Sequence, residues 1–118
     1  MVPQRAAAVF QVTSLETAVK HYQEVLGFTE EFRFGDYAGL KFGEVYLHLS
    51  GHNVHDRPVG GGNVYLFCDE VDRYYAELKR KGARLKSEPK DYPYGMRDFA
   101  VMDLDGNLLG FGCESKDA

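Results

Sequence analysis

The sequence predicts an α+β fold in which two βαβββ modules form a pseudo-symmetric, curved mixed sheet with a central cleft. Three observations lead to this prediction. The order strand, helix, three strands occurs twice in the chain, at an offset of about 56 residues. Apolar and polar residues alternate along most of the expected strands, as in sheets that bury one face. Residues 94–111 read as strand, tight turn and strand, because Asp105-Gly106 is a strong hairpin signal.

Length, composition and charge indicate one globular domain spanning residues 1–118. A chain of this size buries roughly two-thirds of its unfolded surface, which is enough for a stable fold. The formal net charge of −4 and the lack of a basic stripe argue against nucleic acid as a partner. No apolar run is typical of a signal peptide or a membrane span, so we expect a cytoplasmic protein without membrane contact. Cys68 and Cys113 lack metal-ligand or redox spacing and are expected to be small buried hydrophobes.

The first module is expected at about residues 5–50. Thr13 or Ser14 can cap its helix, and Thr13 with Glu16 matches a capping box. Apolar residues recur at helical spacing until Gly27, which is expected to end the helix in a left-handed conformation. Strands are expected at residues 6–12, 28–34, 37–42 and 45–50.

The second module is expected at about residues 63–114, after a linker at 51–62 that is rich in Gly, His and Asn. The glycine run in this linker is not a phosphate-binding loop, because no Gly-Lys-Ser/Thr follows it. Asp69 or Glu70 is expected to start a helix that ends at Gly82. Strands are expected at residues 63–68, near 84–87, at 97–102 and at 107–113.

Alternation along the strands predicts two faces of different character, because successive side chains point to opposite sides. The apolar set is expected to pack under the helices: Ala8, Phe10, Val12, Val45, Leu47, Leu49, Val64, Leu66, Cys68, Leu109, Phe111 and Cys113. The opposite set is mixed, aromatic and partly polar: Ala7, Val9, Gln11, Tyr46, His48, Asn63, Tyr65, Phe67, Leu108 and Gly110. Such a face is typical of a small-molecule cleft, and the alternative is a further packed layer such as a dimer interface.

Two groups of motifs stand out near the ends of the chain: VTSLETA, HY and LGF within residues 12–28, and RDF with DLDGN within residues 97–107. In this order and at this separation they resemble the glyoxalase / bleomycin resistance / dioxygenase superfamily, which has the vicinal oxygen chelate fold. Phe32, residues 36–39 and residues 94–95 look most like the metal-free bleomycin resistance proteins. Leu104 stands where the family usually has Pro, which is expected to alter only the turn.

The resemblance also bears on whether the chain is an enzyme. Enzymes of this superfamily hold a divalent metal with four inward-facing His, Glu or Gln residues. The matching positions here are Ala7, His48, Asn63 and Gly110. Ala and Gly offer no ligand atom, an Asn amide is a weak donor, and one imidazole cannot hold a catalytic metal. His21, His52 and His55 lie on the helix or in the linker, so we expect no cofactor and no catalytic residue.

The leading hypothesis is a metal-free protein of the bleomycin resistance type that sequesters a bulky aromatic or antibiotic-like ligand. The resemblance implies a homodimer whose clefts lie between two chains. The expected ligand-binding residues are Phe32, Tyr37, Tyr46, His48, Asn63, Tyr65, Phe67, Tyr94 and Arg97. Aromatic rings would stack on a flat ligand, and His48 and Asn63 would orient it. Arg97 would pair either with an anionic group of the ligand or with a neighbouring Asp or Glu.

The sequence leaves two alternatives. One is a metal-dependent lyase, isomerase or dioxygenase of the same superfamily, with its metal ligands at shifted positions. The other is an accessory interaction module without a small ligand. A stoichiometric metal that is lost on His48→Ala would favour the first, and a complete lack of thermal stabilisation by aromatic compounds would favour the second.

Overall fold

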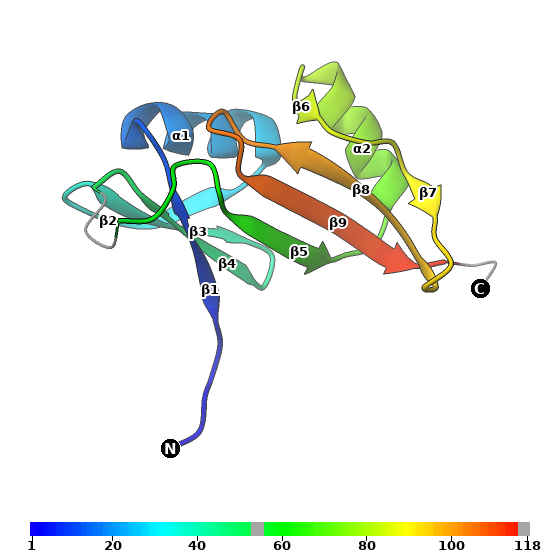
Figure 1. The fold of residues 1–118 in the computed structure, drawn as a ribbon, viewed down its shortest axis with the longest axis horizontal. Helices are drawn as coiled ribbons and strands as arrows, with labels where there is room; N and C mark the ends of the chain where they lie inside the picture. The colour runs from blue at the N-terminus through cyan, green and yellow to red at the C-terminus, as the bar shows by residue number, and fades with distance from the viewer. Residues whose placement is uncertain (53–55, 116–118) are drawn as a thin grey trace.

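The computed structural model describes residues 1–52 and 56–115, which form two mixed β-sheets with helices packed against them (Figure 1). The first sheet has the strand order β1-β4-β3-β2, with β1 parallel to β4 and the other neighbours antiparallel. Its strands are β1 (Ala7–Gln11), β2 (Thr29–Phe34), β3 (Tyr37–Phe42) and β4 (Val45–Ser50). The strands expected in the first half of the chain are therefore confirmed.

The second sheet repeats this arrangement. Its strands are β5 (Asn63–Phe67), β6 (Arg84–Leu85), β7 (Lys90–Asp91), β8 (Met96–Met102) and β9 (Leu108–Glu114). β5 is parallel to β9, which pairs with β8, and β8 pairs with both β6 and β7. The short strand β7 has no signal in the sequence. The repeated strand and helix order confirms the predicted α+β fold, and the expected curved sheet consists of two hydrogen-bonded sheets.

Helical segments cover one face of each sheet (Figure 1). α1 (Leu15–His21) passes directly into a π-helical turn, η1 (Tyr22–Leu26), and Gly27 follows with a φ of 88°, which confirms the predicted left-handed end. α2 (Val71–Arg80) follows Glu70, whose φ is 46° and whose side chain does not cap the helix. Within the described ranges, no helix is long and apolar enough to cross a membrane.

The start of α1 differs in detail from the prediction. The Ser14 hydroxyl accepts a hydrogen bond from the backbone N–H of Thr17 at 3.4 Å, so Ser14 caps the helix. Thr13 instead donates its backbone N–H to the Asp105 carboxylate at 3.0 Å. The capping box expected from Thr13 and Glu16 is therefore wrong, because a loop distant in sequence uses the backbone of Thr13.

That loop, between β8 and β9, is held by one buried carboxylate. Asp103 is 1% exposed, and its Oδ1 accepts from the backbone N–H groups of Asp105 and Asn107, both at 2.9 Å. Its Oδ2 accepts from the Tyr22 hydroxyl at 2.8 Å and from the Asn107 amide at 2.9 Å. Gly106 has a φ of 98°, which confirms its predicted role in the turn. The hairpin thus also anchors the first helical segment, with the carboxylate fully hydrogen-bonded as burial requires.

One continuous core joins the two halves of the chain. The expected apolar face supplies much of it, including Phe10, Leu47, Leu49, Leu66, Leu109 and Phe111. Tyr74 of α2 links the halves, because its hydroxyl donates to the Leu26 carbonyl at 2.6 Å and its ring centre lies 5.7 Å from that of Phe42. Cys68 and Cys113 pack against the core as free thiols, but both are half-buried rather than fully buried.

Candidate functional site

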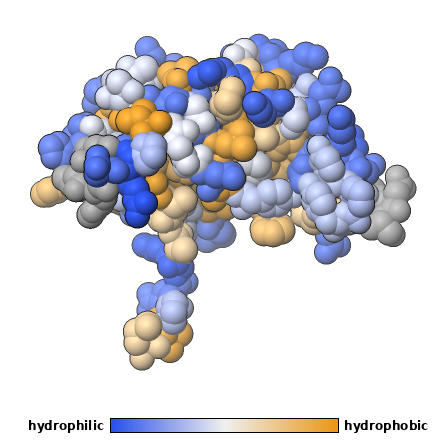
Figure 2. Space-filling model, in the orientation of Figure 1, coloured by the Kyte–Doolittle hydropathy of each residue, from blue (hydrophilic) through white to orange (hydrophobic). Residues whose placement is uncertain are grey.

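Each sheet packs one face against the helices, and we call the opposite face its open face. Large apolar side chains on or beside the open faces are exposed: Val9, Phe32, Phe34, Tyr65, Phe67 and Tyr94. Figure 2 shows hydrophobic residues scattered among hydrophilic ones on one side of the molecule, with the residues before β1 extending away from the body. Ligand sites combine aromatic walls with a few fixed polar groups, and the open faces bring exposed aromatic side chains together with polar ones, so they are the candidate site.

On the open face of the first sheet, three expected residues form one cluster. The Tyr37 hydroxyl lies 2.8 Å from Nδ1 of His48, and the Phe32 ring meets the His48 ring edge-on at 5.3 Å between centres. Phe32 lies flat over Gly39, where a Cβ atom would come within 1.9 Å of its ring. Burial raises the pKa of Tyr37, so its phenol stays protonated at neutral pH. The cluster therefore presents an imidazole held in place by a phenol and an aromatic ring.

Beside this cluster lies a hollow of about 1080 Å³, bordered by Val9, Gln11, Phe34 and Tyr37. Gln11 is 8% exposed, and its side-chain nitrogen has no hydrogen-bond partner among the described residues. An unsatisfied buried donor is costly, so this amide is suited to meet a polar group that enters the hollow. Alternation placed Gln11 on the correct face, but sequence reasoning did not include it in the site.

On the open face of the second sheet, two phenols converge on one carboxylate. The hydroxyls of Tyr65 and Tyr94 donate to Oδ2 of Asp98 at 2.9 and 2.7 Å, and Asp98 is 9% exposed. The hydrogen bond to Asp98 raises the pKa of Tyr94 to about 12. Burial, and then the bond to Asp98, raises the pKa of Tyr65 as well. Both phenols therefore remain neutral donors that fix the carboxylate.

The Tyr65 ring lies across two glycines of β9. Tyr65 is paired with Gly110 in the parallel register of β5 and β9. A Cβ atom at Gly110 would come within 3.1 Å of this ring, and one at Gly112 would come within 1.9 Å of the phenol oxygen. Gly110 is one of the positions where metal-dependent relatives are expected to carry a ligand. The Tyr65 ring therefore occupies the space that a side chain at position 110 would need.

Three further expected residues lie on the open faces but outside these clusters. Tyr46 of β4 lies beneath two cations, with the Arg5 guanidinium carbon 4.5 Å and Lys41 Nζ 5.5 Å from its ring centre. Asn63 is exposed at the start of β5. Phe67 is 77% exposed, and its ring meets Tyr65 edge-on at 5.2 Å.

The structure does not bring Arg97 to the other expected residues. It points to the helix side of β8, where it donates to both carboxylate oxygens of Asp72, at 2.9 and 2.7 Å, and lies 3.5 Å from Asp91. These bonds lower the pKa of Asp72. The alternative interpretation of Arg97, an ion pair with a neighbouring Asp, is the one that the structure shows. The side chain of the neighbouring Asp98 lies on the open face instead. Because Phe99 is buried in the core, strand alternation could have placed Asp98 on the opposite face.

The four positions matched to metal ligands carry Ala7, His48, Asn63 and Gly110, of which His48 alone has a strong donor, and its Nδ1 meets Tyr37. Across residues 1–52 and 56–115, no group of three or more His, Cys, Asp or Glu side chains is placed to hold a metal ion. The Ser50 hydroxyl donates to the backbone carbonyl of His52, which engages it away from His48. His55 lies outside the described residues.

Comparisons with solved structures show the fold. The bleomycin-binding protein of Streptomyces verticillus, solved with copper(II)-bleomycin, is 24% identical, with 98% of this chain and all of that chain covered and a TM-score of 0.78. A bleomycin resistance determinant encoded on the transposon Tn5 is 22% identical, covering 96% and 99% of the two chains, with a TM-score of 0.79. A glyoxalase/bleomycin resistance protein/dioxygenase from Nocardioides is 21% identical, covering 100% and 89%, with a TM-score of 0.76.

A search of curated proteins found no match. The sequence profile of one family matches residues 5–111, which is nearly the whole chain and includes all of the first sheet and all of the second except the last three residues of β9. This match agrees with the motifs at the two ends of the chain and with the fold shared with the solved structures. The chain belongs to the Glyoxalase/Bleomycin resistance protein/Dioxygenase superfamily.

Proposed function

We propose that this protein sequesters a bulky aromatic, antibiotic-like small molecule, without a metal ion, in clefts between two copies of the chain. The observation that carries the proposal is the pair of phenols that hold Asp98 on an open face rich in exposed aromatic rings. Small-molecule sites combine apolar walls with a few fixed polar groups, and stacking contributes about 0.5–1.5 kcal/mol per aromatic pair beyond burial. Asp98 and His48 are the fixed polar groups.

The proposed site differs from the nine residues expected from sequence. It keeps eight of them, adds Gln11 and Asp98, and leaves out Arg97, which is occupied on the helix side. In the proposed site, the aromatic rings and polar groups of the two open-face clusters contact the ligand. The hollow beside Gln11 is large enough for a ligand of drug size.

Sequestration without a metal is supported by the donor set and by packing. The Cβ atom of a metal-binding residue at position 110 would lie 3.1 Å from the Tyr65 ring. A metal centre at this position would therefore need the space that the ring occupies. Ala7, on β1 of the first sheet, also has no donor atom. A metal-free binding protein needs no metal ligand at positions 7 and 110, whereas a metal-dependent enzyme of the expected kind would need one at each.

Pairing of two copies is supported by the exposed apolar residues of the open faces. Phe34 is 84% exposed and Phe67 is 77% exposed, and a second copy that covers the open faces would bury both rings. In a two-fold dimer each copy would cover the exposed face of the other and complete two identical clefts. The ligand class is suggested by the relatives, since two of the similar structures are described as binding bleomycin or determining resistance to it.

Calorimetric titration with bleomycin and a panel of planar aromatic compounds tests the proposal. We expect Tyr65→Ala and Tyr94→Ala each to weaken binding by roughly tenfold or more, because each removes a ring and one of the donors that fix Asp98. Arg97→Ala is the matched control and should bind like the unmodified protein. Unchanged binding in both tyrosine variants would show that the site is misplaced. A stoichiometric metal that is lost on His48→Ala would favour the enzyme alternative, and no binding of any compound would favour an interaction module.

A further inference from the structure

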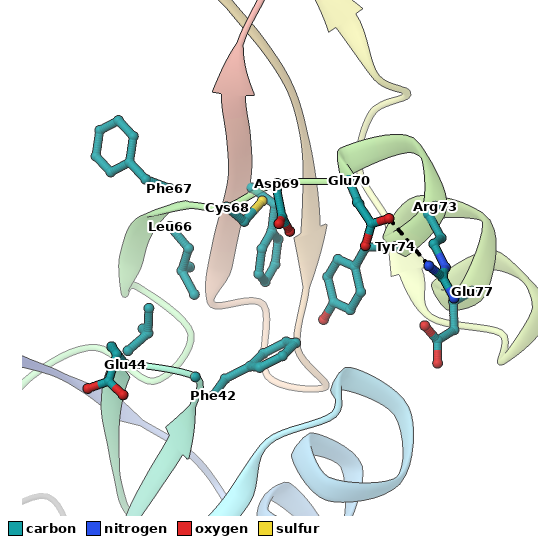
Figure 3. A pocket seen from close by; sticks show the side chains of 13 residues that line it. Phe42, Glu44, Leu66, Phe67, Cys68, Asp69, Glu70, Arg73, Tyr74 and Glu77 are labelled. Atoms are coloured by element: carbon teal, nitrogen blue, oxygen red, sulfur yellow. Dashed lines mark hydrogen bonds and ion pairs between the residues drawn. The ribbon is translucent and has the colours of Figure 1, made fainter.

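A separate cavity of about 570 Å³ lies between the two halves of the chain, where the β3–β4 hairpin meets the end of β5 and the start of α2 (Figure 3). Phe67 is the one open-face residue that borders it, and in Figure 3 the Phe67 ring points away from the other lining side chains. We propose that this cavity binds a small organic cation with a flat, apolar body. The proposal does not depend on the function of the open faces.

The floor of this inter-half cavity is apolar and rigid. Leu66 and Phe111 are buried beneath it, and Phe42 and Tyr74 form its walls. Ring centres lie 4.8 Å apart for Tyr74 and Phe111 and 5.7 Å apart for Tyr74 and Phe42, and both pairs meet edge-on. The hydrogen bond from the Tyr74 hydroxyl to Leu26 fixes the wall across the junction of the two halves. A flat apolar ligand would therefore contact preorganised aromatic surfaces.

The mouth of the cavity is strongly acidic. Its four carboxylates are Glu44, Asp69, Glu70 and Glu77, and its one cation is Arg73. Glu70 pairs with Arg73 at 3.3 Å, as Figure 3 shows, and Glu77 pairs with Lys81 at 3.4 Å. Among the described residues, Glu44 and Asp69 have no ion-pair partner. The lining residues carry a formal charge of −3, or −2 when the Lys81 that pairs with Glu77 is counted, over an apolar floor, which favours cations and disfavours anions.

Helix stability accounts for only part of this arrangement. Acidic residues before and within the first turn of a helix are common, because they suit the helix dipole, and this explains Asp69 and Glu70. Glu77 lies further along α2 and stabilises the helix through its pair with Lys81, four residues on. Neither effect explains Glu44, which comes from a hairpin in the other half of the chain. Carboxylates from two separate elements, the β3–β4 hairpin and the start of α2, thus border one apolar floor, and the cavity volume lies within the usual range for ligand sites.

Cys68 lines the cavity and provides a reporter of occupancy. Burial raises the pKa of its thiol, with smaller contributions from Cys113 and Asp69, so alkylation at pH 7 should be slow and sensitive to access. Cys113 is also half-buried, yet it does not border the cavity, which makes it a matched internal control. A ligand in the cavity should protect Cys68 and leave Cys113 unchanged.

The experiment uses two flat aromatic probes of opposite charge, 9-aminoacridine, which is protonated at pH 7, and anthracene-9-carboxylate. We expect the cation to bind and to slow alkylation of Cys68 severalfold, measured by mass spectrometry, while the rate at Cys113 stays constant. The anion should protect neither thiol. Equal protection of both thiols by the cation, protection by the anion, or no protection by the cation would overturn the proposal. So would Cys68 protection that rises with protein concentration without any probe, since a second copy would then cover the cavity.

Charge variants locate the interaction. The double variant Glu44→Gln with Asp69→Asn should weaken binding of 9-aminoacridine about tenfold at low salt, since each step removes a carboxylate from the cavity mouth. The double variant Glu24→Gln with Glu31→Gln has the same change in net charge at exposed sites outside the cavity and should bind within about twofold of the unmodified protein. Tyr65→Ala should leave this binding unchanged. Equal losses in both charge variants, or abolition by Tyr65→Ala, would contradict the proposal.

Discussion

The open faces of the two sheets use the same backbone plan for different chemistry. In the register of the first sheet His48 of β4 lies opposite Gly39, and in the second sheet Gly110 of β9 lies opposite Ala100. The first position carries an imidazole held by Tyr37, and the equivalent second position is bare and covered by the Tyr65 ring. The fixed polar group of the second sheet is a carboxylate on β8 instead. One fold thus presents an imidazole on one open face and a carboxylate held by two phenols on the other.

This difference shows that the strand pairing is repeated, whereas the functional side chains are not. An aromatic ring lies over glycine in both halves, Phe32 over Gly39 and Tyr65 over Gly112. The Phe32 ring lies beside the imidazole of His48, whereas the Tyr65 ring lies beside the carboxylate of Asp98. Because these two polar groups differ, a ligand that spans two such faces would be bound in one orientation. Polar groups of unlike kind give direction, and the aromatic rings give most of the contact area.

The largest expected effect comes from adding one methyl group beneath either ring. Gly39→Ala and Gly112→Ala would each place Cβ 1.9 Å from ring or hydroxyl atoms, so the ring must move. Because both rings are partly exposed and can swing aside, we expect chiefly weaker ligand binding, with a loss near the lower end of about 1–3 kcal/mol in the free energy of unfolding by urea denaturation. Gly110→Ala, at 3.1 Å, is the control and should cost less. If Gly110→Ala is the more damaging of the two β9 variants, the position of the Tyr65 ring is wrong.

Removing the charge of Asp98 should change the titration of the second face alone. In Asp98→Asn the pKa of Tyr94 should fall from about 12 toward its ordinary value of 10, measured by ultraviolet absorbance. The raised pKa means that Asp98 stabilises the folded protein fully below pH 10, and that this contribution is lost as the pH rises through about 12. The variant should therefore lose less stability than the unmodified protein over this alkaline range. Asp72→Asn, on the helix side, should leave the Tyr94 titration unaltered.

Removing the phenol that meets His48 should affect the first face more mildly. Tyr37→Phe deletes one hydrogen bond while keeping the ring, so we expect a cost of about 0.5–1.5 kcal/mol and a changed ¹⁵N chemical shift of Nδ1. Tyr46→Phe is the matched control on the same face. A His48 spectrum that responds to Tyr46→Phe and not to Tyr37→Phe would contradict the described cluster.

Arg97→Ala should have the smallest effect. The ion pair with Asp72 is exposed to solvent, so we expect only a small loss of stability and no change in ligand affinity. Calorimetric titration beside urea denaturation checks both. A large loss of affinity with little loss of stability would show that Arg97 belongs to the ligand-binding site.

Most of the fold was predictable because its signals are local. Alternation identified the strands of the first sheet, and the positive φ values of Gly27 and Gly106 match the helix end and the turn that were expected. The capping box failed because Asp105, distant in sequence, accepts the Thr13 amide. β7 was missed because it has two residues and depends on pairing with β8.

The candidate site was less predictable because it depends on contacts between elements. Family resemblance selected Arg97, yet strand alternation turns it toward α2 and leaves Asp98 on the open face. Gln11 and the fit of Tyr65 on Gly112 become visible only when the strands are placed side by side. Aromatic residues could be assigned to a face from sequence, but their hydrogen-bond partners could not, since those partners come from other strands.

Calorimetric titration of the EDTA-treated protein with metal-free bleomycin is the sharpest test of sequestration without a metal. We expect saturable binding of about one ligand per chain, because a two-fold dimer contains two identical clefts. Tyr65→Ala should weaken this binding by roughly tenfold or more. Binding that appears only after a divalent metal is restored, or binding that Tyr65→Ala leaves unchanged, would show that the protein does not act in this way.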